Sequence, residues 1–449
     1  MSKRLIRNAR IVNEGAIREA DILIDRGRIA KIAPAIDAPA DCPAFDARGR
    51  YVLPGMIDDQ VHFRQPGATH KGDIASESAA AVAGGITSFM DMPNVNPPTL
   101  SAERLEDKLG MAAGVARANY GFYLGASNDN IDDIQRLPPG LACGVKVFMG
   151  ASTGNMLVDD PEALNSIFAR CPVPVVTHCE DTPTIQANER HYRNLYGEQV
   201  PMEMHPHIRS AEACFMSSSL AVDLARQHDA RLHVLHLTTA REMTLFSTAP
   251  LEDKRITAEV CVHHLFFDDS DYAAKGTLIK CNPAIKTDAD RQALLRALVE
   301  NRIDVIATDH APHTLEEKQQ SYFKAPSGMP LVQHALLSLM QQYHLGRLTL
   351  PLIVEKTSHA PARIFGIPDR GYIREGWWAD LVVVDPDTPY TVSRDNILYK
   401  CGWSPFEGYK FLSSIAATFV NGELAYQDGR VSDGVFGQRL TFDNHETRG

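Results

Sequence analysis

Polar residues that can bind a metal ion or move a proton recur where short apolar runs of this sequence end. They are His62, Arg64, Asn94, Lys146, His178, His236, Asn282, Asp309 and His313. A single histidine in such a place is more often a hydrogen-bonded structural residue than a ligand. Several histidines after successive runs, accompanied by a lysine and an aspartate, instead indicate one shared site. Imidazole and carboxylate groups are ligands that zinc prefers, so the pattern predicts a catalytic metal site.

Lys146 and Asp309 have the most specific chemistry in this set. Lys146 lies between two valines, and taken alone it is best explained as an exposed lysine at a strand end. A buried ammonium group loses its charge readily, and a neutral lysine can react with carbon dioxide to give a carbamate that bridges two metal ions. Asp309, taken alone, is compatible with a helix N-cap. Beside a metal, it can instead take a proton from water and deliver it to a leaving nitrogen.

The segment 51–365 must position these residues. Short apolar runs alternate in it with segments of helical period, such as 101–118, 210–228 and 288–301. The apolar runs are 53–63, 85–93, 120–127, 143–150, 173–179, 231–237, 255–261 and 303–309. This alternation predicts a parallel α/β core, and eight strands close a (β/α)8 TIM-like barrel whose active site lies at the C-terminal strand ends. A doubly wound open sheet is the alternative, but no GxGxxG follows the first strand.

The two ends of the chain, 1–50 and 366–449, predict a smaller second domain. Residues 4–50 read as strands and hairpins, WADLVVVD (378–385) reads as a buried strand, and Asn421-Gly422 is a turn between two strand-like runs. Neither end is large enough to bury both of its faces alone. We therefore expect the N- and C-terminal strands to form one composite β domain.

Composition excludes several classes of function. The net charge of −11, without clustered Lys and Arg, argues against nucleic-acid binding. No stretch approaches the roughly 18 apolar residues of a membrane span, and the N-terminus lacks the apolar core of a signal peptide. The eight cysteines are scattered without CxxC pairs, which is typical of reduced thiols. The sequence therefore predicts a cytoplasmic protein that acts on a small molecule.

Four longer motifs connect the candidate residues: PGMIDDQVHFRQPG (54–67), DMPNVNPP (91–98), GVKVFMGASTG (144–154) and ATDHAPHTLEEK (307–318). HCED (178–181), HVLHLTT (233–239), CNPAIK (281–286) and GWWADLVVVD (376–385) agree with them. Over nearly its whole length the sequence resembles the amidohydrolase superfamily, and within it dihydroorotases of the bacterial class with a metal-bridging lysine. Hydantoinases and allantoinases share the barrel, the lysine and the histidines, but differ around ATDHAPH and MPN-x-x-P.

The resemblance implies a role for each residue. One or two zinc ions would be bound by His62, carboxylated Lys146, His178, His236 and Asp309, with Asp309 also the catalytic acid and base. The anionic substrate, dihydroorotate or N-carbamoyl-aspartate, would be held by Arg64, Asn94, Asn282, His313, Ser327 and Gly328. The implied reaction is the reversible ring closure between these two compounds in pyrimidine (UMP) biosynthesis. Superfamily members are often dimers or tetramers, so we also expect a homo-oligomer.

Gln60 departs from the resemblance, because the family usually has His-x-His on the first strand and Gln60 replaces the first histidine. The second metal position is therefore in doubt. One alternative is another cyclic-amide hydrolase, allantoinase or hydantoinase-like, against which Arg64 and Asn94 argue. Another is an inactive homologue that scaffolds aspartate transcarbamoylase. Gln60 favours this last alternative, and the retained lysine and histidines argue against it.

Strand alternation gives two further expectations. Asp58, Gln60, His62 and Arg64 should share one face of the first strand, with Asp59 on the other. Likewise, His233 should lie on the opposite face from His236 and off the site. The histidine pair His263 and His264 also has a place in the family pattern, and we interpret it as structural.

Overall fold

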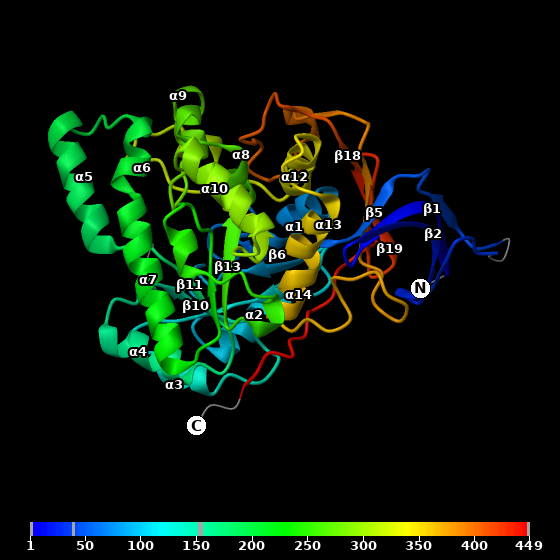
Figure 1. Cartoon of the computed structure of the whole chain (residues 1–449), viewed down its shortest axis with the longest axis horizontal. Helices are drawn as coiled ribbons and strands as arrows, with labels where there is room; N and C mark the ends of the chain where they lie inside the picture. The colour runs from blue at the N-terminus through cyan, green and yellow to red at the C-terminus, as the bar shows by residue number, and fades with distance from the viewer. Residues whose placement is uncertain (1–2, 38–40, 151–155, 447–449) are drawn as a thin grey trace.

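A closed barrel of parallel strands forms the larger part of the molecule. The computed structural model describes residues 3–37, 41–150 and 156–446, and Figure 1 shows the barrel with its helices beside a smaller β-rich part. The eight barrel strands are β6 (Met56–Val61), β7 (Ile86–Asp91), β8 (Asn119–Phe122), β10 (Val145–Phe148), β11 (Val175–His178), β12 (Leu232–Val234), β13 (Ile256–Cys261) and β14 (Val305–Ala307). Each strand overlaps one of the predicted apolar runs, which confirms the (β/α)8 fold.

The order of the strands closes the barrel. Strands β6, β7 and β8 pair in that order, and β14, β13, β12, β11 and β10 pair in a second group that ends at β9 (Leu124–Gly125). Strands β8 and β9 are consecutive, with only Tyr123 between them. A parallel bridge between Val61 and His310 joins β6 to the end of β14. All C-terminal strand ends consequently meet at one mouth.

Helices between the strands begin at side-chain caps. Ser101, Ser210 and Thr287 each accept a hydrogen bond from a backbone N–H of the first helical turn. These caps start three of the outer helices: α2 (Ala102–Ala112), α7 (Ala211–His228) and α10 (Asp288–Val299). Helix α2 ends before the predicted residue 118, close to Gly114, whose φ is +70°. The other long helices are α1 (Ile74–Ala83), α4 (Pro161–Arg170), α5 (Thr182–Tyr196) and α12 (Ala335–His344).

The two chain ends form one mixed sheet, which confirms the composite β domain. Its order is β20-β19-β18-β15-β5-β1-β2-β3, and β15 (Leu381–Asp385) pairs with β5 (Tyr51–Pro54) where the two ends meet. The other strands are β1 (Arg4–Asn13), β2 (Ala16–Asp25), β3 (Arg28–Ala33), β4 (Ala44–Asp46), β18 (Ser414–Val420), β19 (Glu423–Gln427) and β20 (Arg430–Val431). Because β5 starts at residue 51, the sheet extends just past the proposed domain boundary at residue 50.

Alternate residues of this sheet are buried in different cores. Leu381 and Val383 belong to the core of the β domain, whereas Val382 and Val384 belong to the main core that includes the barrel helices. The sheet thus buries both faces, one of them against the barrel. Figure 1 shows the C-terminal trace running from the β domain back beneath the barrel. There Leu440 N–H donates to Tyr120 O, so residues beyond the sheet close the N-terminal end of the barrel.

The side chains inside the barrel differ from the arrangement that regular strand alternation predicts. Asp59 on β6 contacts His233 on β12, with 3.2 Å between Oδ2 and Nε2. These strands are not neighbours in the sheet, so the contact crosses the interior. The pairing of β6 with β7 shifts register between Asp58 and Val61, and His236 has a φ of +38°. These two irregularities let Asp59 and His233 point inward below the site instead of outward.

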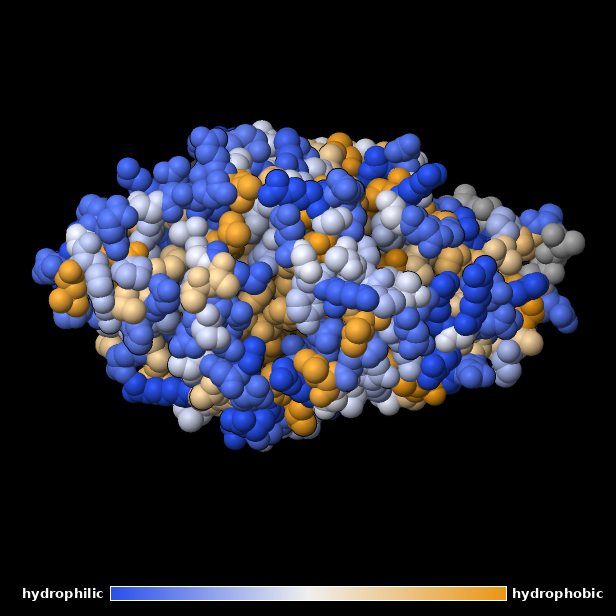
Figure 2. Space-filling model, turned by 90° about the horizontal axis from the view of Figure 1, so that it is seen from above, coloured by the Kyte–Doolittle hydropathy of each residue, from blue (hydrophilic) through white to orange (hydrophobic). Residues whose placement is uncertain are grey.

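The outer surface is largely hydrophilic. The face in Figure 2 is covered mainly by hydrophilic residues, among which hydrophobic ones form small groups. Across the described residues, none of the helices combines the length and the apolar character that crossing a membrane requires.

Candidate metal centre and substrate pocket

All eleven residues predicted for the site line one pocket of about 390 Å³ at the C-terminal mouth of the barrel. They are His62, Arg64, Asn94, Lys146, His178, His236, Asn282, Asp309, His313, Ser327 and Gly328. Gln60 lines the same pocket, together with four residues that were not predicted: Phe148, Arg209, Ala311 and Pro326. The structure therefore brings the predicted residues together, and their individual roles stay predictions.

His178 and His236 face each other on one side of the pocket. His178 Nδ1 lies 3.0 Å from His236 Nε2, and His178 Nε2 lies 3.0 Å from Glu180 Oε2. Burial lowers the pKa of His178 and holds that of His236 well below its usual value, so both rings are neutral at pH 7. Glu180, anchored by Arg209 at 2.6 Å, fixes the outer nitrogen of His178. The inner nitrogen is left to face His236, as a metal ligand requires.

His62 and Asp309 form the opposite side. Asn94 Oδ1 lies 2.9 Å from His62 Nδ1, and Asp309 Oδ1 lies 3.1 Å from His62 Nε2. Gln60 Nε2 donates to the same oxygen of Asp309 at 3.1 Å. Although burial opposes it, the hydrogen bond with His62 lowers the pKa of Asp309, so the carboxylate is ionised at neutral pH. Its Oδ2 atom remains available for a proton.

Lys146 lies between these two sides, and its side chain is fully buried. Its Nζ sits 4.7 Å from the centre of the Phe148 ring. Among the hydrogen bonds and ion pairs of the described residues, none uses this ammonium. Burial lowers the pKa of Lys146 to about 8, which puts a reactive neutral amine within reach at physiological pH.

The donor set fits a divalent metal. The imidazoles of His62, His178 and His236, an ionised carboxylate and a buried lysine line one small pocket. In addition, His236 Nδ1 is buried without a hydrogen-bond partner among the described residues. Such a collection of facing nitrogens and oxygens is better satisfied by a cation than by mutual contacts. His178, His236 and Lys146 could hold one ion, and His62, Asp309 and Lys146 a second.

Arg64 and Lys71, which both contact His313, make one end of the pocket cationic. Arg64 Nε donates to Pro312 O at 3.0 Å, and its Nη2 lies 3.0 Å from His313 Nε2. Lys71 Nζ donates to His313 Nδ1 at 3.0 Å. Burial, together with the nearby charges of Arg64 and Lys71, holds the pKa of His313 well below its usual value. Within the described part of the chain, no carboxylate lies at ion-pair distance from Arg64.

The backbone of Ser327 and Gly328 closes the pocket beside His313. Ser327 O lies 3.0 Å from His313 Nε2. Gly328 has a φ of +129°, and a Cβ there would come within 2.5 Å of Ala311 O, so only glycine fits. The Lys318 ammonium donates to Gly328 O at 2.8 Å and to two further carbonyls, which holds this wall in place.

Comparison with known proteins places the chain in a family. The Amidohydrolase family model matches residues 51–425. A dihydroorotase from Halobacterium salinarum is 34% identical over 432 residues, which cover 96% of this chain and 98% of that protein. The chain belongs to the amidohydrolase family.

Other relatives of this amidohydrolase carry different names. An allantoinase from Bacillus velezensis is 31% identical over 443 residues and 97% of each chain. The solved structure of an L-hydantoinase (dihydropyrimidinase) from Arthrobacter aurescens superposes with a TM-score of 0.92 at 27% identity, covering 98% of this chain and all of that one. The comparisons therefore establish the family, whereas the differing names of the relatives leave the substrate to the chemistry of the pocket.

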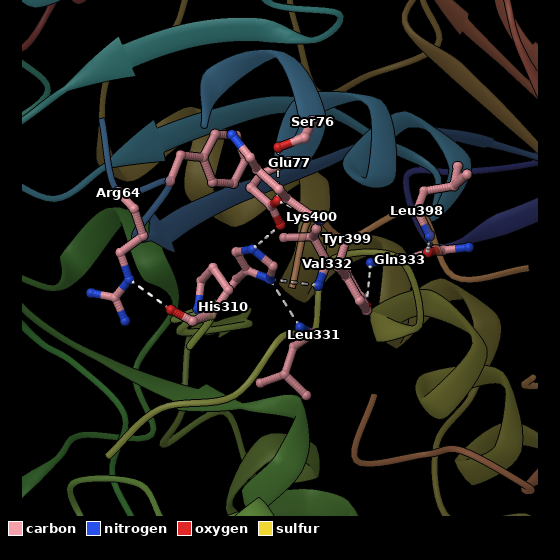
Figure 3. A network of polar contacts seen from close by, with 12 residues as sticks. Arg64, Ser76, Glu77, His310, Leu331, Val332, Gln333, Leu398, Tyr399 and Lys400 are labelled. Carbon is pink, nitrogen blue, oxygen red and sulfur yellow. Dashed lines mark hydrogen bonds and ion pairs between the residues drawn. The ribbon is translucent and has the colours of Figure 1, made fainter. Parts of the chain in front are cut away.

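A polar network behind Asp309 positions the C-terminal end of β14 in this amidohydrolase. Figure 3 shows Glu77 facing His310, whose other ring nitrogen faces the backbone of Leu331 and Val332. His310 Nε2 lies 2.8 Å from Glu77 Oε2, and Leu331 N–H donates to His310 Nδ1 at 2.9 Å. His62 N–H in turn donates to His310 O at 2.7 Å. The network thus fixes the residue after Asp309 and the backbone of His62 together.

Sequence reasoning missed the residues that orient the site: Glu77, Glu180, Arg209, His310 and Lys318. Glu180 lies in the motif HCED (178–181) and His310 lies in ATDHAPH, so both were visible within motifs but had no assigned role. Arg209 and Glu77 come from other segments, and no local pattern indicates their contacts. His263 and His264 lie outside the pocket lining and are buried, and their structural role stays a prediction.

The contact of Glu180 with His178 leads to a prediction about metal affinity. Replacing Glu180 by glutamine keeps the shape but removes the charge that orients His178. We expect Glu180→Gln to weaken zinc binding by about 10- to 100-fold, the usual effect of losing such a supporting carboxylate. Competition with a chromogenic chelator measures the affinity. Glu212→Gln, at an exposed glutamate paired with Arg241, is the matched control and should bind zinc normally; equal affinity in both variants would exclude this role for Glu180.

Proposed function

We propose that this protein is a dihydroorotase, which interconverts dihydroorotate and N-carbamoyl-aspartate in de novo pyrimidine biosynthesis. The coarser assignment, hydrolysis of a cyclic amide, has the support of relatives named dihydroorotase, allantoinase and hydantoinase. The observation that carries the finer assignment is the guanidinium of Arg64. It lines the pocket without a carboxylate partner among the described residues. A half-buried guanidinium without a counterion is unfavourable, so the ligand should supply the carboxylate.

Dihydroorotate has a ring carboxylate that fits this end of the pocket. Arg64 offers a fork-shaped pair of donors, which a carboxylate can accept together. Asn94 uses its oxygen on His62, so its amide N–H groups remain free to donate to the substrate. Asn282 also lines the pocket, and we propose that it contacts the ring. Hydantoin and allantoin lack a carboxylate in this place.

The residues of the metal centre fit the chemistry of ring opening. A divalent metal ion, when bound, lowers the pKa of a coordinated water to about 7 and polarises a carbonyl group. We propose zinc, held by His62, His178, His236, Asp309 and a carboxylated Lys146. Asp309 Oδ1 is engaged by His62 and Gln60, so Oδ2 takes the proton of the attacking water. Asp309 then returns this proton to the ring nitrogen as the amide bond breaks.

Turnover of three substrates distinguishes the proposal from its alternatives. Purified, zinc-loaded protein should hydrolyse dihydroorotate and should act poorly on allantoin and hydantoin. Preference for allantoin or hydantoin would assign another cyclic-amide hydrolase. No turnover of any of the three, in protein that retains zinc, would indicate an inactive homologue that scaffolds a partner such as aspartate transcarbamoylase. We also propose a cytoplasmic location and a homo-oligomeric state, a dimer or a tetramer; the same preparation can address the oligomeric state.

Carboxylation of Lys146 gives a prediction for a variant. Lys146→Ala should lose both zinc and activity, because the carbamate would be shared by the two metal positions. Short carboxylic acids added to the buffer should restore part of the activity by occupying the vacated space. Zinc content and initial rates, with and without the acid, measure both effects. An unmodified Lys146 in a metal-loaded, active crystal would contradict the prediction.

Arg64 gives a prediction about substrate binding. Arg64→Lys keeps the positive charge but loses the paired donors. We expect kcat/KM for dihydroorotate to fall tenfold or more, since a hydrogen bond to a charged group contributes about 1.5–3 kcal/mol. The control is Arg241→Lys, an arginine that pairs with Glu212 at the surface, which should keep its kcat/KM. Full kcat/KM in the Arg64 variant would show that the carboxylate binds elsewhere.

Gln60 gives a prediction about the second metal. Its amide oxygen faces the Cys261 thiol, with 3.7 Å between Oε1 and Sγ, and its amide nitrogen donates to Asp309. A neutral amide is a poor zinc ligand, so the position made by His62 and Asp309 should release its ion easily. Gln60→His should therefore retain more zinc than the unaltered protein after mild dialysis. Equal zinc retention, measured by plasma mass spectrometry, would mean that Gln60 does not weaken the site.

A further inference from the structure

Three ionisable side chains meet inside the barrel, below the pocket and outside its lining. We call Asp59, His233 and Glu259 the inner cluster; they come from β6, β12 and β13. All three side chains are fully buried. His233 Nε2 lies 3.2 Å from Asp59 Oδ2 and 3.6 Å from Glu259 Oε2, and one potential ligand atom from each residue lies within 4.8 Å of the others.

The facing atoms of the inner cluster are not satisfied by hydrogen bonds. Both carboxylate oxygens of Asp59, Oε2 of Glu259 and Nε2 of His233 are buried without a hydrogen-bond partner among the described residues. Buried polar atoms of native proteins are nearly always paired, so these atoms need an explanation, above all Asp59 Oδ2, Glu259 Oε2 and His233 Nε2, which lie around one point. A proton on His233 could serve only one of the oxygens, because one ring nitrogen carries one N–H.

The outer atoms of the same residues are held in place. Thr257 Oγ1 lies 2.8 Å from His233 Nδ1, and His236 N–H donates to Glu259 Oε1 at 3.1 Å. Fixing one nitrogen of a histidine, so that the other faces a common point, is how proteins orient metal ligands. The bulge in β6 supplies the third member, because it turns Asp59 into the interior beside Gln60.

We propose that the inner cluster is a separate binding site for a divalent transition-metal ion such as zinc. Although burial opposes it, the neighbouring carboxylates of Asp59 and Glu259 raise the pKa of His233 to about 9, so a bound ion would take the place of the imidazole proton. Two carboxylates and a neutral imidazole then carry two negative charges, which a divalent ion neutralises in the buried interior. Ligand atoms about 2.0–2.2 Å from a tetrahedral zinc ion are about 3.3–3.6 Å apart, close to the two spacings around His233. The ion would connect β6, β12 and β13 across the barrel. It would also support the metal centre above, because Glu259 holds the backbone of His236.

Anomalous diffraction from the whole protein tests this site without any substitution. Crystals grown with zinc should give a peak between Asp59, His233 and Glu259 in a map at the zinc absorption edge. The metal centre at His178 and His236 provides the internal control. A peak at the metal centre with none at the inner cluster would overturn the proposal. This outcome leaves the proposed reaction untouched, since that reaction depends on the pocket above.

Variants give a second, independent measurement of the same ion. Asp59→Asn and Glu259→Gln should each lower the zinc content by about one ion per chain, by plasma mass spectrometry. Asp58→Asn is the matched control: it lies next to Asp59, but its carboxylate is already occupied by Thr308, so the zinc content should not change. Circular dichroism identifies any variant that fails to fold. Unchanged zinc content in folded Asp59→Asn and Glu259→Gln would contradict the proposal.

Discussion

The pocket depends on backbone turns at three strand ends. Arg64, His236 and Asp309 have φ values of +66°, +38° and +50°. Non-glycine residues adopt this region rarely and at a cost of about 1 kcal/mol or more, so the surroundings must hold them there. In each case a fixed partner does so: Pro312 O for the side chain of Arg64, Glu259 for the backbone of His236, and the bonded neighbour His310 for Asp309.

These turns explain why the sequence predicts the pocket better than the interior beneath it. The eight apolar runs indicate the strands, and in a parallel barrel their C-terminal ends must meet, so the residues at those ends could be assigned to one site. Which way a side chain points also depends on bulges. Regular alternation put Asp59 and His233 on the faces opposite to Gln60 and His236, whereas the irregular backbone near Asp58 and His236 turns both inward. His233 nevertheless lies outside the pocket lining, as predicted. No local pattern marks such a bulge.

The sequence also could not predict the contacts that hold the site residues in place. Glu77 on α1 contacts His310 after β14, and Arg209 contacts Glu180 after β11. These pairs are far apart in the chain and have no fixed spacing, so only the folded structure brings them together. They nevertheless decide which ring nitrogen of His178 faces the pocket and where Asp309 lies. The chemistry of the site thus depends on residues outside the family motifs, such as Glu77 and Arg209, as well as on residues within those motifs.

The two ends of the pocket differ in charge, which suits an anionic cyclic amide. The end near Arg64 and Lys71 is cationic, although the whole chain carries a net charge of −11, and the opposite end holds the histidines and the buried lysine.

The most direct test of this account is a crystal structure of the zinc-loaded protein with dihydroorotate. We expect the ligand carboxylate on Arg64, with the amide carbonyl toward His178, His236 and Asp309. A ligand in the reverse orientation, or a carboxylate that does not contact Arg64, would contradict the proposed function.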